Sequence, residues 1–475
     1  MAYTDTARVA DVAAAAARAR MADEVGARLD RLPFTGLHRR TCGTIALGTF
    51  FDSFDSLIIA AALTAIVSSL HINFTQIGLI ISAAYLGMAV GAPLFGWLAE
   101  LIGRKPVCVW MIAGFGVLSI LAAFAWDFQS LLIVRLIEGL ALGGQVPVSA
   151  ALYSEFLPKE RRGRGFFYGY TVMFSTGIFL APLVGLLCFT LFGPELGWRV
   201  LFLTGGFAIA VAIYAQYALP ESPRWLADKG RGDEAAAIVA RFEARARELG
   251  KSLPAPEIVT RSGDRTTRFS ELFQGIYLKR TMLGWSLFFA TYFVSYGLSI
   301  WIPTLFVKLG GLPASYALVL TVIGGAIHLG FVFLWGNVAD WIGRRRSFIL
   351  GYSLSILGLA IGVFSIFVLK SAGWQMLFLS SLIAGLGTNF TAALCFLYNS
   401  ELFPTRMRAW GTSTGSTVSR VGSFIAPTAV GALLDAQLGV TSVYIMFAAV
   451  NCLGLLAIVT LGPETSKGGL EEVSA

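Results

Sequence analysis

The sequence predicts an all-α membrane protein with twelve transmembrane helices in two pseudo-symmetric six-helix halves. First, 56% of its 475 residues are hydrophobic and 13% are charged, whereas a soluble protein carries about 25% charged residues. Second, apolar runs of about 20 residues, long enough to cross a hydrocarbon core, recur from one end of the chain to the other. Third, two charged motifs of the first half of the chain return in the second half.

The apolar runs divide the chain into two groups of six, which we assign to an N-terminal half, 42–219, and a C-terminal half, 280–462. A polar segment precedes them at 1–41, a connector with a helical pattern near 233–249 separates them at 220–279, and a tail follows at 463–475. The predicted spans are 42–70, 76–99, 106–126, 130–153, 165–191, 198–219, 280–307, 315–339, 347–370, 374–402, 410–436 and 441–462.

The distribution of basic residues predicts the orientation. If the N-terminal segment and every second loop lie on one side, that side holds 31 of the 36 Lys and Arg residues. Basic loops face the cytoplasm, so both termini are expected there. This asymmetry accounts for the net charge of +8 without a nucleic-acid partner. Two cations, Arg135 and Arg420, remain within predicted spans.

The chain repeats itself at the cytoplasmic ends of corresponding spans. The segment Gly96-Trp-Leu-Ala-Glu-Leu-Ile-Gly-Arg-Lys105 returns 240 positions later as Gly336-Asn-Val-Ala-Asp-Trp-Ile-Gly-Arg-Arg345. Ser154-Glu-Phe-Leu-Pro-Lys-Glu-Arg-Arg162 returns 246 positions later as Ser400-Glu-Leu-Phe-Pro-Thr-Arg-Met-Arg408. Parallel repeats related by an axis along the membrane normal are typical of large secondary transporters.

The two loops of the form Gly-x-x-x-(Asp/Glu)-x-x-Gly-Arg-(Lys/Arg) resemble the signature of the major facilitator superfamily. Pro220-Glu-Ser-Pro-Arg-Trp225 resembles a motif of the branch that holds sugar porters, organic-ion transporters and bacterial niacin-permease-like carriers. Arg28-Leu-Asp-Arg-Leu-Pro33 and Gly143-Gly-Gln-Val-Pro147 resemble niacin-permease-like carriers and aromatic-acid:proton symporters. The resemblance covers the chain beyond residue 28. It implies transport by alternating access, with substrate bound between the halves.

The first span carries two acids, Asp52 and Asp55, inside an apolar run. A charge at the centre of a bilayer costs about 2.5–3.5 kcal/mol on insertion scales, so such residues are functional candidates by default. A position near a helix end in water is the structural alternative. Arg135, which needs a partner, is expected to pair with Asp55, and the resemblance to proton-coupled relatives implies that this pair carries proton coupling. Glu138 lies about one turn from Arg135, so the proton carrier is open among Asp55, Asp52 and Glu138.

Arg420 has no acid near it in the eleventh predicted span. The span resembles that of organic-anion transporters, where an Arg takes this place, which implies a clamp for a carboxylate. The guanidinium fork suits such a ligand. A structural alternative is that Arg420 pairs with Asp435 or with an interfacial group.

Aromatic and polar side chains of other spans are further candidates for the substrate site. Trp285, Tyr292 and Tyr296 share one face of the seventh span, and Tyr and Trp present flat apolar walls with a polar tip. Helix packing or a membrane-interface belt is the alternative, and the belt is expected for Trp301. His328 is expected to be a buried, hydrogen-bonded residue. The remaining candidates are Gln145, Asn389, Phe396, Tyr398 and Asn399.

The repeated loops predict a charge network that holds the halves together when the cytoplasmic side is closed. Gly96 and Gly336 are expected to allow close helix approach, and the charges of the network to form modest ion pairs that break in each cycle. The alternative is that these charges only fix the orientation of the chain in the membrane and form no network. The network comprises Gly96, Glu100, Gly103, Arg104, Glu155 and Arg162, and in the second half Gly336, Asp340, Gly343, Arg344, Glu401 and Arg408.

Together these features favour a monomeric symporter of a bacterial inner membrane that couples proton entry to uptake of a small organic anion. An aromatic monocarboxylate of nicotinate or benzoate type fits best. A sugar or polyol:proton symporter of the same fold and a transporter-like ligand sensor are the alternatives. No nucleophile–base pair or metal-ligand spacing is evident, so no enzyme, metal or cofactor is predicted. The five cysteines lie singly in apolar runs, as small core residues do.

Overall fold

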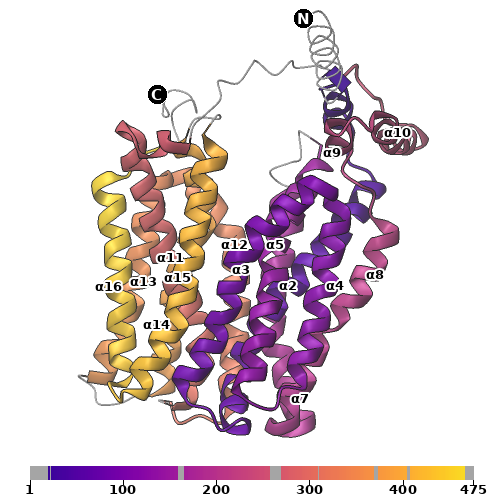
Figure 1. Ribbon diagram of the computed structural model, residues 1–475. Coiled ribbons are helices and arrows are strands. Elements are labelled where there is room, and N and C mark those ends of the chain that lie inside the picture. The colour runs from indigo at the N-terminus through magenta and orange to yellow at the C-terminus, as the bar shows by residue number, and fades with distance from the viewer. Residues whose placement is uncertain are drawn as a thin grey trace, which may run out of the picture.

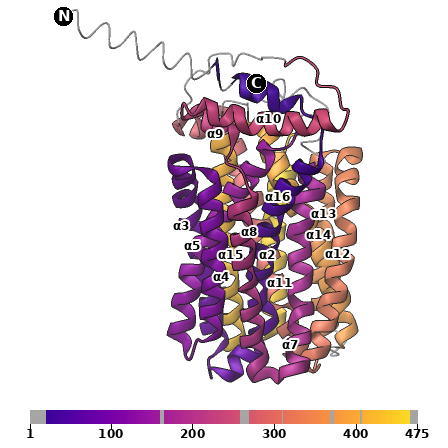
Figure 2. The ribbon, with the colours of Figure 1, turned by 90° about the vertical axis from the view of Figure 1, so that its right-hand side faces the viewer.

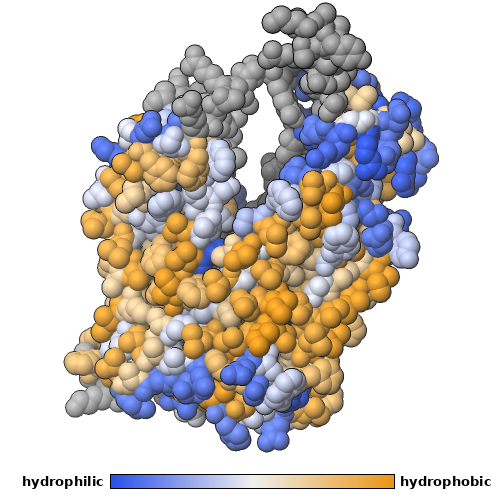
Figure 3. All heavy atoms as spheres, viewed as in Figure 1, coloured by the Kyte–Doolittle hydropathy of each residue, from blue (hydrophilic) through white to orange (hydrophobic). Residues whose placement is uncertain are grey.

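The computed structural model describes residues 20–21, 23–158, 165–256, 269–308, 310–367, 373–403 and 407–465. Every regular element in these ranges is a helix (Figure 1). Eleven helical segments are long and apolar enough to cross a membrane. On the face shown in Figure 3, apolar side chains cover the middle of the molecule and polar side chains gather towards both ends.

One of the eleven segments contains two spans. Gly169–Ala218 has 50 residues, and a helix of that length would extend about 75 Å, more than twice the hydrocarbon thickness. Its helix breaks at Gly193, whose φ of 72° is a left-handed conformation that glycine adopts without strain. Pro194 begins the next helix, a position where the N–H that proline lacks would have no helical partner. The chain therefore crosses the membrane twelve times, as the sequence predicts.

The twelve spans form two groups of six that stand beside one another (Figure 1). The helices of the N-terminal group are α2 (Gly36–Ser69), α3 (Phe74–Ile102), α4 (Arg104–Ala123), α5 (Phe128–Glu155), α7 (Val172–Gly205) and α8 (Phe207–Ala218). The π-helix η2 (Phe166–Thr171) leads into α7, and the chain turns back within α7 at Gly193. Those of the C-terminal group are α11 (Gly275–Lys308), α12 (Ala314–Ile342), α13 (Arg344–Phe367), α14 (Trp374–Leu402), α15 (Arg408–Asp435) and α16 (Gly439–Leu461).

The connector contributes two short helices, α9 (Pro223–Asp228) and α10 (Gly232–Glu248), and the 3-10 turn η3 (Phe269–Phe273). The predicted connector helix is therefore confirmed as α10. It lies crosswise over one end of the bundle, which we call the connector end (Figure 2). Glu243 of α10 binds Arg28 and Arg31, at 2.9 and 2.7 Å, and so holds the segment before α2 against the connector.

The two halves meet mainly where α3 packs against α15, α7 against α12 and α2 against α11. Along the α3–α15 seam, Ser82 Oγ donates to the carbonyl of Phe424 at 2.5 Å, and a Cβ on Gly431 would meet the Phe74 carbonyl. These contacts belong to the end opposite the connector. At the connector end the halves stand apart (Figure 3). The central space is thus open towards the connector and closed at the far end.

Candidate functional site

Asp55 lies fully buried in α2 and has two partners from other helices. Ser119 Oγ of α4 donates to its Oδ1 at 2.7 Å, and Arg135 Nη1 of α5 approaches Oδ2 at 3.3 Å. The predicted pairing of Asp55 with Arg135 is therefore present, and the alternative position at a wet helix end is wrong for Asp55. Asp52, which is 3% exposed, is buried as well.

Arg135 is shared between two carboxylates. Its Nη1 also donates to Glu138 Oε2 at 2.7 Å, and its guanidinium faces the Phe202 ring at 5.8 Å. Both Arg135 and Glu138 are almost fully buried. Two carboxylates beside one guanidinium leave an excess negative charge, which is costly away from water. Binding of one proton by either acid would make the cluster neutral.

Close helix packing fixes this cluster. A Cβ on Gly139 would overlap the backbone carbonyl of Ala84, and one on Gly143 would overlap that of Met88. Side chains at these positions would push α5 away from α3. The glycines after Arg135 in the sequence therefore let α5 present Arg135 and Glu138 to α2 at hydrogen-bond distance.

Arg420 of α15 reaches α3 of the opposite half. Its Nη1 lies 3.5 Å from Met88 Sδ of α3, and within the described ranges no carboxylate forms an ion pair with it. Asp435, the predicted structural alternative, is engaged elsewhere: its carboxylate accepts from the Thr75 backbone N–H and hydroxyl at 2.7 and 2.6 Å. The interpretation that Arg420 pairs with Asp435 is therefore wrong.

The side chains around Arg420 are aromatic and acidic. Tyr296 of α11 stacks with Tyr292 at 6.0 Å and meets the edge of Tyr85 of α3 at 4.9 Å between ring centroids. The Arg420 guanidinium lies within electrostatic range of Tyr296 and of Asp52 in α2. Asp52 Oδ2 is buried and has no hydrogen-bond partner among the described residues. Arg420 of the C-terminal half and Asp52 of the N-terminal half thus both lack an ionic partner among the described residues.

The structure brings together some of the predicted binding residues and separates others. Phe396 joins Tyr292, at 6.4 Å between centroids. Trp285 packs against Phe273 of η3 at the connector end, three turns from Tyr296. Asn399 donates to the Gly411 carbonyl at 2.9 Å and packs α14 on α15, and Gln145 lies buried within the N-terminal half, 3.9 Å from Cys108 Sγ. Trp285, Asn399 and Gln145 are therefore packing residues in this conformation.

Other candidates have simple structural positions. Asn389 is half-buried in α14, and no hydrogen bond of its side chain to another described residue is found. Tyr398 donates to the Pro463 carbonyl at 2.7 Å. Trp301 is completely buried against Phe74, so it does not face lipid as a residue of an aromatic belt would.

Tyr85, Met88 and Ser119 contact the site and were not predicted from the sequence. Tyr85 and Met88 are three residues apart in an otherwise apolar helix, with the buried Ser82 a further three residues before them. Ser82 and Tyr85, polar groups three residues apart, mark one helical face, and this was the signal available for Tyr85.

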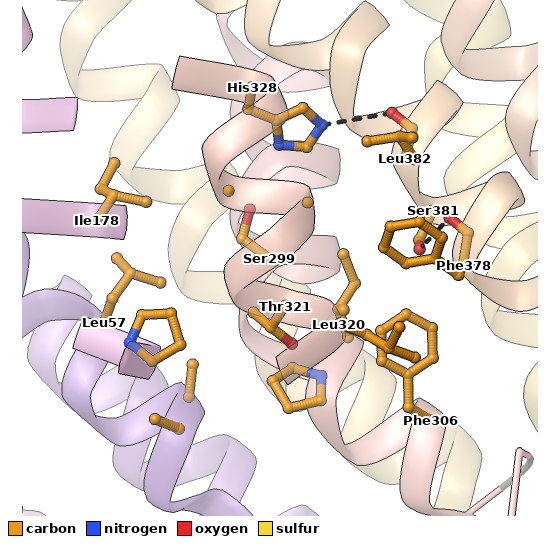
Figure 4. Close-up of a pocket in the computed structure, with 17 residues that line it drawn as sticks. Leu57, Ile178, Ser299, Phe306, Leu320, Thr321, His328, Phe378, Ser381 and Leu382 are labelled. Carbon is orange, nitrogen blue, oxygen red and sulfur yellow. Dashed lines mark hydrogen bonds between the residues drawn. The ribbon is translucent and has the colours of Figure 1, made fainter. Parts of the chain in front are cut away.

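A small cavity of about 90 Å³ lies between the halves, on the closed side of the tyrosines. Figure 4 shows Leu57 and Ile178 of the first half opposite Leu320, Phe378 and Phe306 of the second. Ser299, one turn beyond Tyr296, also lines it. His328 Nε2 lies 3.3 Å from the Leu382 carbonyl at its rim (Figure 4). His328 is therefore hydrogen-bonded as expected, but it is half-buried rather than buried.

The repeated loops form one polar cluster in each half. In the first, Arg104 of α4 binds Glu155, and Glu100 at 3.0 Å. In the second, Arg344 lies 3.3 Å from Glu401. Each ion pair found between the described residues of these loops stays within its own half. The predicted pairing across the halves remains a prediction for the opposite conformation.

A third element completes each cluster and was missed in the sequence. Glu221 accepts from the first backbone N–H groups of α4, and Glu464 does the same for α13. Ser222 and Thr465, which follow these acids, donate to Glu155 and Glu401, each at 2.5 Å. The signal was a third repeat, since Pro220-Glu-Ser returns as Pro463-Glu-Thr.

The glycines of the repeated loops have two different roles. Gly103 and Gly343 end helices with φ of 117° and 90°, conformations that favour glycine, and bring Glu221 and Glu464 close. A Cβ on Gly96 would meet no atom within 4 Å, so the expected close helix approach at Gly96 is wrong for this conformation. The reason is that the halves are separated at the connector end. Gly336 lies in α12; Arg162 lies outside the described residues, as do the side chains of Asp340 and Arg408.

Comparison with known proteins agrees with this architecture. Residues 41–475 match the family model described as "Sugar (and other) transporter". The chain is 31% identical over 453 residues to the niacin transporter NiaP of Acinetobacter baylyi, covering 94% of this chain and 98% of that protein. It is 28% identical to the 4-hydroxybenzoate transporter PcaK of the same organism, over 79% of this chain and 80% of PcaK.

The solved structure of a D-xylose-proton symporter has the same fold, with a TM-score of 0.72 at 17% identity over 90% of this chain and 99% of that one. The twelve spans, their arrangement in two halves and the family match lead to one conclusion. The chain belongs to the sugar (and other) transporter family of the major facilitator superfamily, and it is a multi-pass membrane transporter rather than an enzyme.

Proposed function

We propose that this transporter imports a small organic anion, an aromatic monocarboxylate of nicotinate or benzoate type, together with protons. The observation that carries the proposal is Arg420, a cation inside the bundle with no carboxylate partner among the described residues. It contacts Met88, one turn of α3 from Tyr85, whose ring meets that of Tyr296. A carboxylate would satisfy the guanidinium, and an aromatic ring would pack against the tyrosines. The names of the niacin and 4-hydroxybenzoate relatives support this substrate class.

Proton coupling rests on the buried cluster of Asp55, Arg135 and Glu138. Protonation of Asp55 would remove the negative charge that faces Arg135 and so weaken the contact between them. The halves could then reorient around the central space. We place the connector end and both termini in the cytoplasm of a bacterial inner membrane, because basic loops gather on that side.

A sugar or polyol:proton symporter is the second candidate. The name of the family model and the xylose symporter fold favour it. The central space argues for the anion, because a neutral sugar would leave Arg420 without a counter-charge.

Binding to purified protein tests the proposal. Nicotinate, benzoate and 4-hydroxybenzoate should bind, while benzamide, nicotinamide and xylose should bind poorly. Arg420→Lys keeps the charge and loses the planar fork, so it should weaken binding of the acids moderately, and Arg420→Ala should weaken it about tenfold to a hundredfold. Arg245→Ala, which removes an exposed cation of α10, is the matched control and should bind as wild type does. Unchanged acid binding by Arg420→Ala, or tighter binding of xylose, would contradict the anion assignment.

A further inference from the structure

Ser119 of α4 joins the cluster around Asp55 to the end of a neighbouring helix. Its Oγ lies 2.7 Å from Asp55 Oδ1 and 3.0 Å from the carbonyl oxygen of Phe202 in α7. Asp55 and Ser119 are both fully buried. A Cβ on Gly205 would overlap Ser119 Oγ, so α7 packs directly on this hydroxyl. One serine thus contacts the carboxylate of one helix and the backbone of another.

The Phe202 carbonyl needs a partner from outside its own helix. In an unbroken helix the Gly206 N–H would bind this carbonyl, which lies four residues before it. Because α7 ends at Gly205, the Gly206 N–H binds the Leu203 carbonyl instead, at 3.0 Å. The last carbonyls of a helix are satisfied by side chains, water or a tighter turn. The Ser119 hydroxyl is in position to do so for Phe202.

Ser119 can partner Asp55 in either protonation state, because a serine hydroxyl carries one proton and can also accept. While Asp55 is ionised, the hydroxyl donates to Oδ1, since a hydrogen bond to a charged acceptor is the stronger one. When Asp55 binds a proton, Oδ1 is the oxygen that can hold it, because Oδ2 faces the Arg135 N–H donor at 3.3 Å. The new O–H of Asp55 donates to Ser119 Oγ. The Ser119 hydroxyl then turns to the Phe202 carbonyl and keeps its own proton.

The other groups that face Asp55 are charged or lie behind Arg135. Arg135 and Glu138 come from α5, and Glu138 is within hydrogen-bond reach of Asp55 when one of the two carboxyls is protonated. Tyr85 of α3 lies within electrostatic range of Arg135, and Asp52 precedes Asp55 by one turn of α2. In the described ranges, α4, α7, α8 and α11 bring no charged group within ion-pair distance of Asp55. The serine of α4 is therefore the neutral side chain in contact with Asp55 that can both donate and accept.

Resting on the proposed proton coupling, we propose that Ser119 is a positioning residue of the proton site, a hydroxyl that partners Asp55 in both of its protonation states. By turning between Asp55 and the Phe202 carbonyl, it lets Asp55 bind and release a proton inside the bundle. No step of this exchange leaves the carboxyl group without a partner, which is the condition that makes buried polar groups costly.

Uptake and exchange of labelled 4-hydroxybenzoate in proteoliposomes separate a role in proton coupling from a role in folding. Uptake driven by a proton gradient requires Asp55 to change its protonation state, whereas exchange of substrate for substrate does not. Ser119→Ala should therefore lower driven uptake by about tenfold or more and leave exchange near that of wild type. Ser119→Cys keeps a weak donor and acceptor of similar size and should recover part of the driven uptake.

Ser380→Ala is the matched control. Ser380 is also fully buried, and its hydroxyl also joins two helices, since it donates to the Gly358 carbonyl of α13 at 2.7 Å. Among the described residues no carboxylate is found beside it. The ratio of driven uptake to exchange in Ser380→Ala should equal that of wild type.

The outcomes separate this inference from the proposed function. If Asp55→Asn still accumulates 4-hydroxybenzoate in response to a proton gradient, the proposed proton coupling itself fails. If Asp55→Asn loses driven uptake and Ser119→Ala keeps it, the role of Ser119 is wrong and the proton coupling stands. Equal losses of uptake and exchange in Ser119→Ala would make Ser119 a packing residue and overturn the inference. If Ser119→Ala does not fold, Ser119→Cys decides by the same criterion.

Thermal unfolding in detergent tests the same contact without a substrate, and it decides the inference if 4-hydroxybenzoate is not transported. Ser119→Ala should lower the unfolding temperature of wild type more than that of Asp55→Ala, in which the hydroxyl has only the Phe202 carbonyl to bind. The difference should be present at acidic and at alkaline pH, because the hydroxyl partners both forms of Asp55. Equal losses in the two backgrounds, or a difference confined to alkaline pH, would overturn the inference.

Discussion

Asp55 and Glu138 share the single guanidinium of Arg135, and all three side chains are buried. At the scale of residues, this cluster gains its stability from mutual compensation. Removal of one member leaves a buried charge without a partner. Neutralising all three members together leaves no uncompensated charge in the interior.

The first prediction follows from that asymmetry. Arg135→Leu should destabilise the protein by about 3–5 kcal/mol, because two carboxylates lose their cation. The variant that combines Asp55→Asn, Arg135→Leu and Glu138→Gln should recover most of the loss. Thermal unfolding in detergent measures both. Equal unfolding temperatures for the single and the triple variant would contradict the compensation.

Part of this residue-level arrangement could be predicted from the sequence. The pairing of Asp55 with Arg135 was predictable because a charge inside an apolar span requires a partner. Trp285 was misplaced because helical periodicity defines a face and not a depth: it lies 11 residues from Tyr296, about 16 Å along the helix. Tyr85 and Met88 were missed because their role depends on α15 of the other half, and helix contacts across the halves are not visible in one sequence.

At the scale of elements, α3 is held in two different ways. Its middle packs without a gap on α5, and its N-terminus is bound by Asp435 of α15. The first contact lies within a half, so rocking of one half against the other leaves it in place. The second joins the halves at the closed end, and an alternating-access cycle has to release it.

The packing of α3 on α5 gives the second prediction. Gly139→Ala would set a methyl group against the Ala84 carbonyl, so the helices must separate and the unfolding temperature should fall. Gly96→Ala, in the same half, meets no atom within 4 Å and should unfold as wild type does. Thermal unfolding of the pair checks this, and an unaffected Gly139→Ala would refute the packing account.

The contact between Asp435 and α3 gives the third prediction. Asp435→Ala removes the acceptor of the Phe74 and Thr75 N–H groups and of the Thr75 hydroxyl, so the closed end should open more often. Spin labels at the N-terminus of α3 and the C-terminus of α15 should report a larger population of long distances. Thr75→Val, which loses the hydroxyl alone, is the control and should have a smaller effect. Identical distance distributions in wild type and Asp435→Ala would exclude this lock.

At the scale of the whole molecule, apolar runs and repeated loops were sufficient to predict twelve spans in two halves. The sequence could not predict which end of the bundle is open, because that depends on the balance between contacts at the two ends. Gly96 illustrates the point: the motif suggested close helix packing, and in this open conformation nothing packs on it.

The connector end supplies the fourth prediction. Hydrogen bonds from Arg28 lower the pKa of Glu243 to about 2, and Arg31 acts in the same direction. Because the pKa is depressed, this contact stabilises the docked segment above the ordinary carboxyl pKa of about 4.3 and is lost as the pH falls towards 2. Glu243→Gln should therefore expose the segment before α2 to faster trypsin cleavage at neutral pH. Glu248→Gln, at an exposed pair of the same helix, should leave cleavage unchanged. Equal cleavage rates for Glu243→Gln and wild type would contradict the docking role.

Proton-coupled transport by the Asp55 cluster is the central claim, and proton entry on addition of substrate tests it most directly. Proteoliposomes with an entrapped pH dye receive 4-hydroxybenzoate outside, and protein-free liposomes correct for passive entry of the undissociated acid. Wild type should acidify the lumen, and Asp55→Asn should not, while Asp55→Asn still exchanges labelled 4-hydroxybenzoate across the membrane. Glu138→Gln shows whether the second acid is also required. Acidification by Asp55→Asn at the wild-type rate, or substrate entry into wild-type vesicles without protons, would contradict the account.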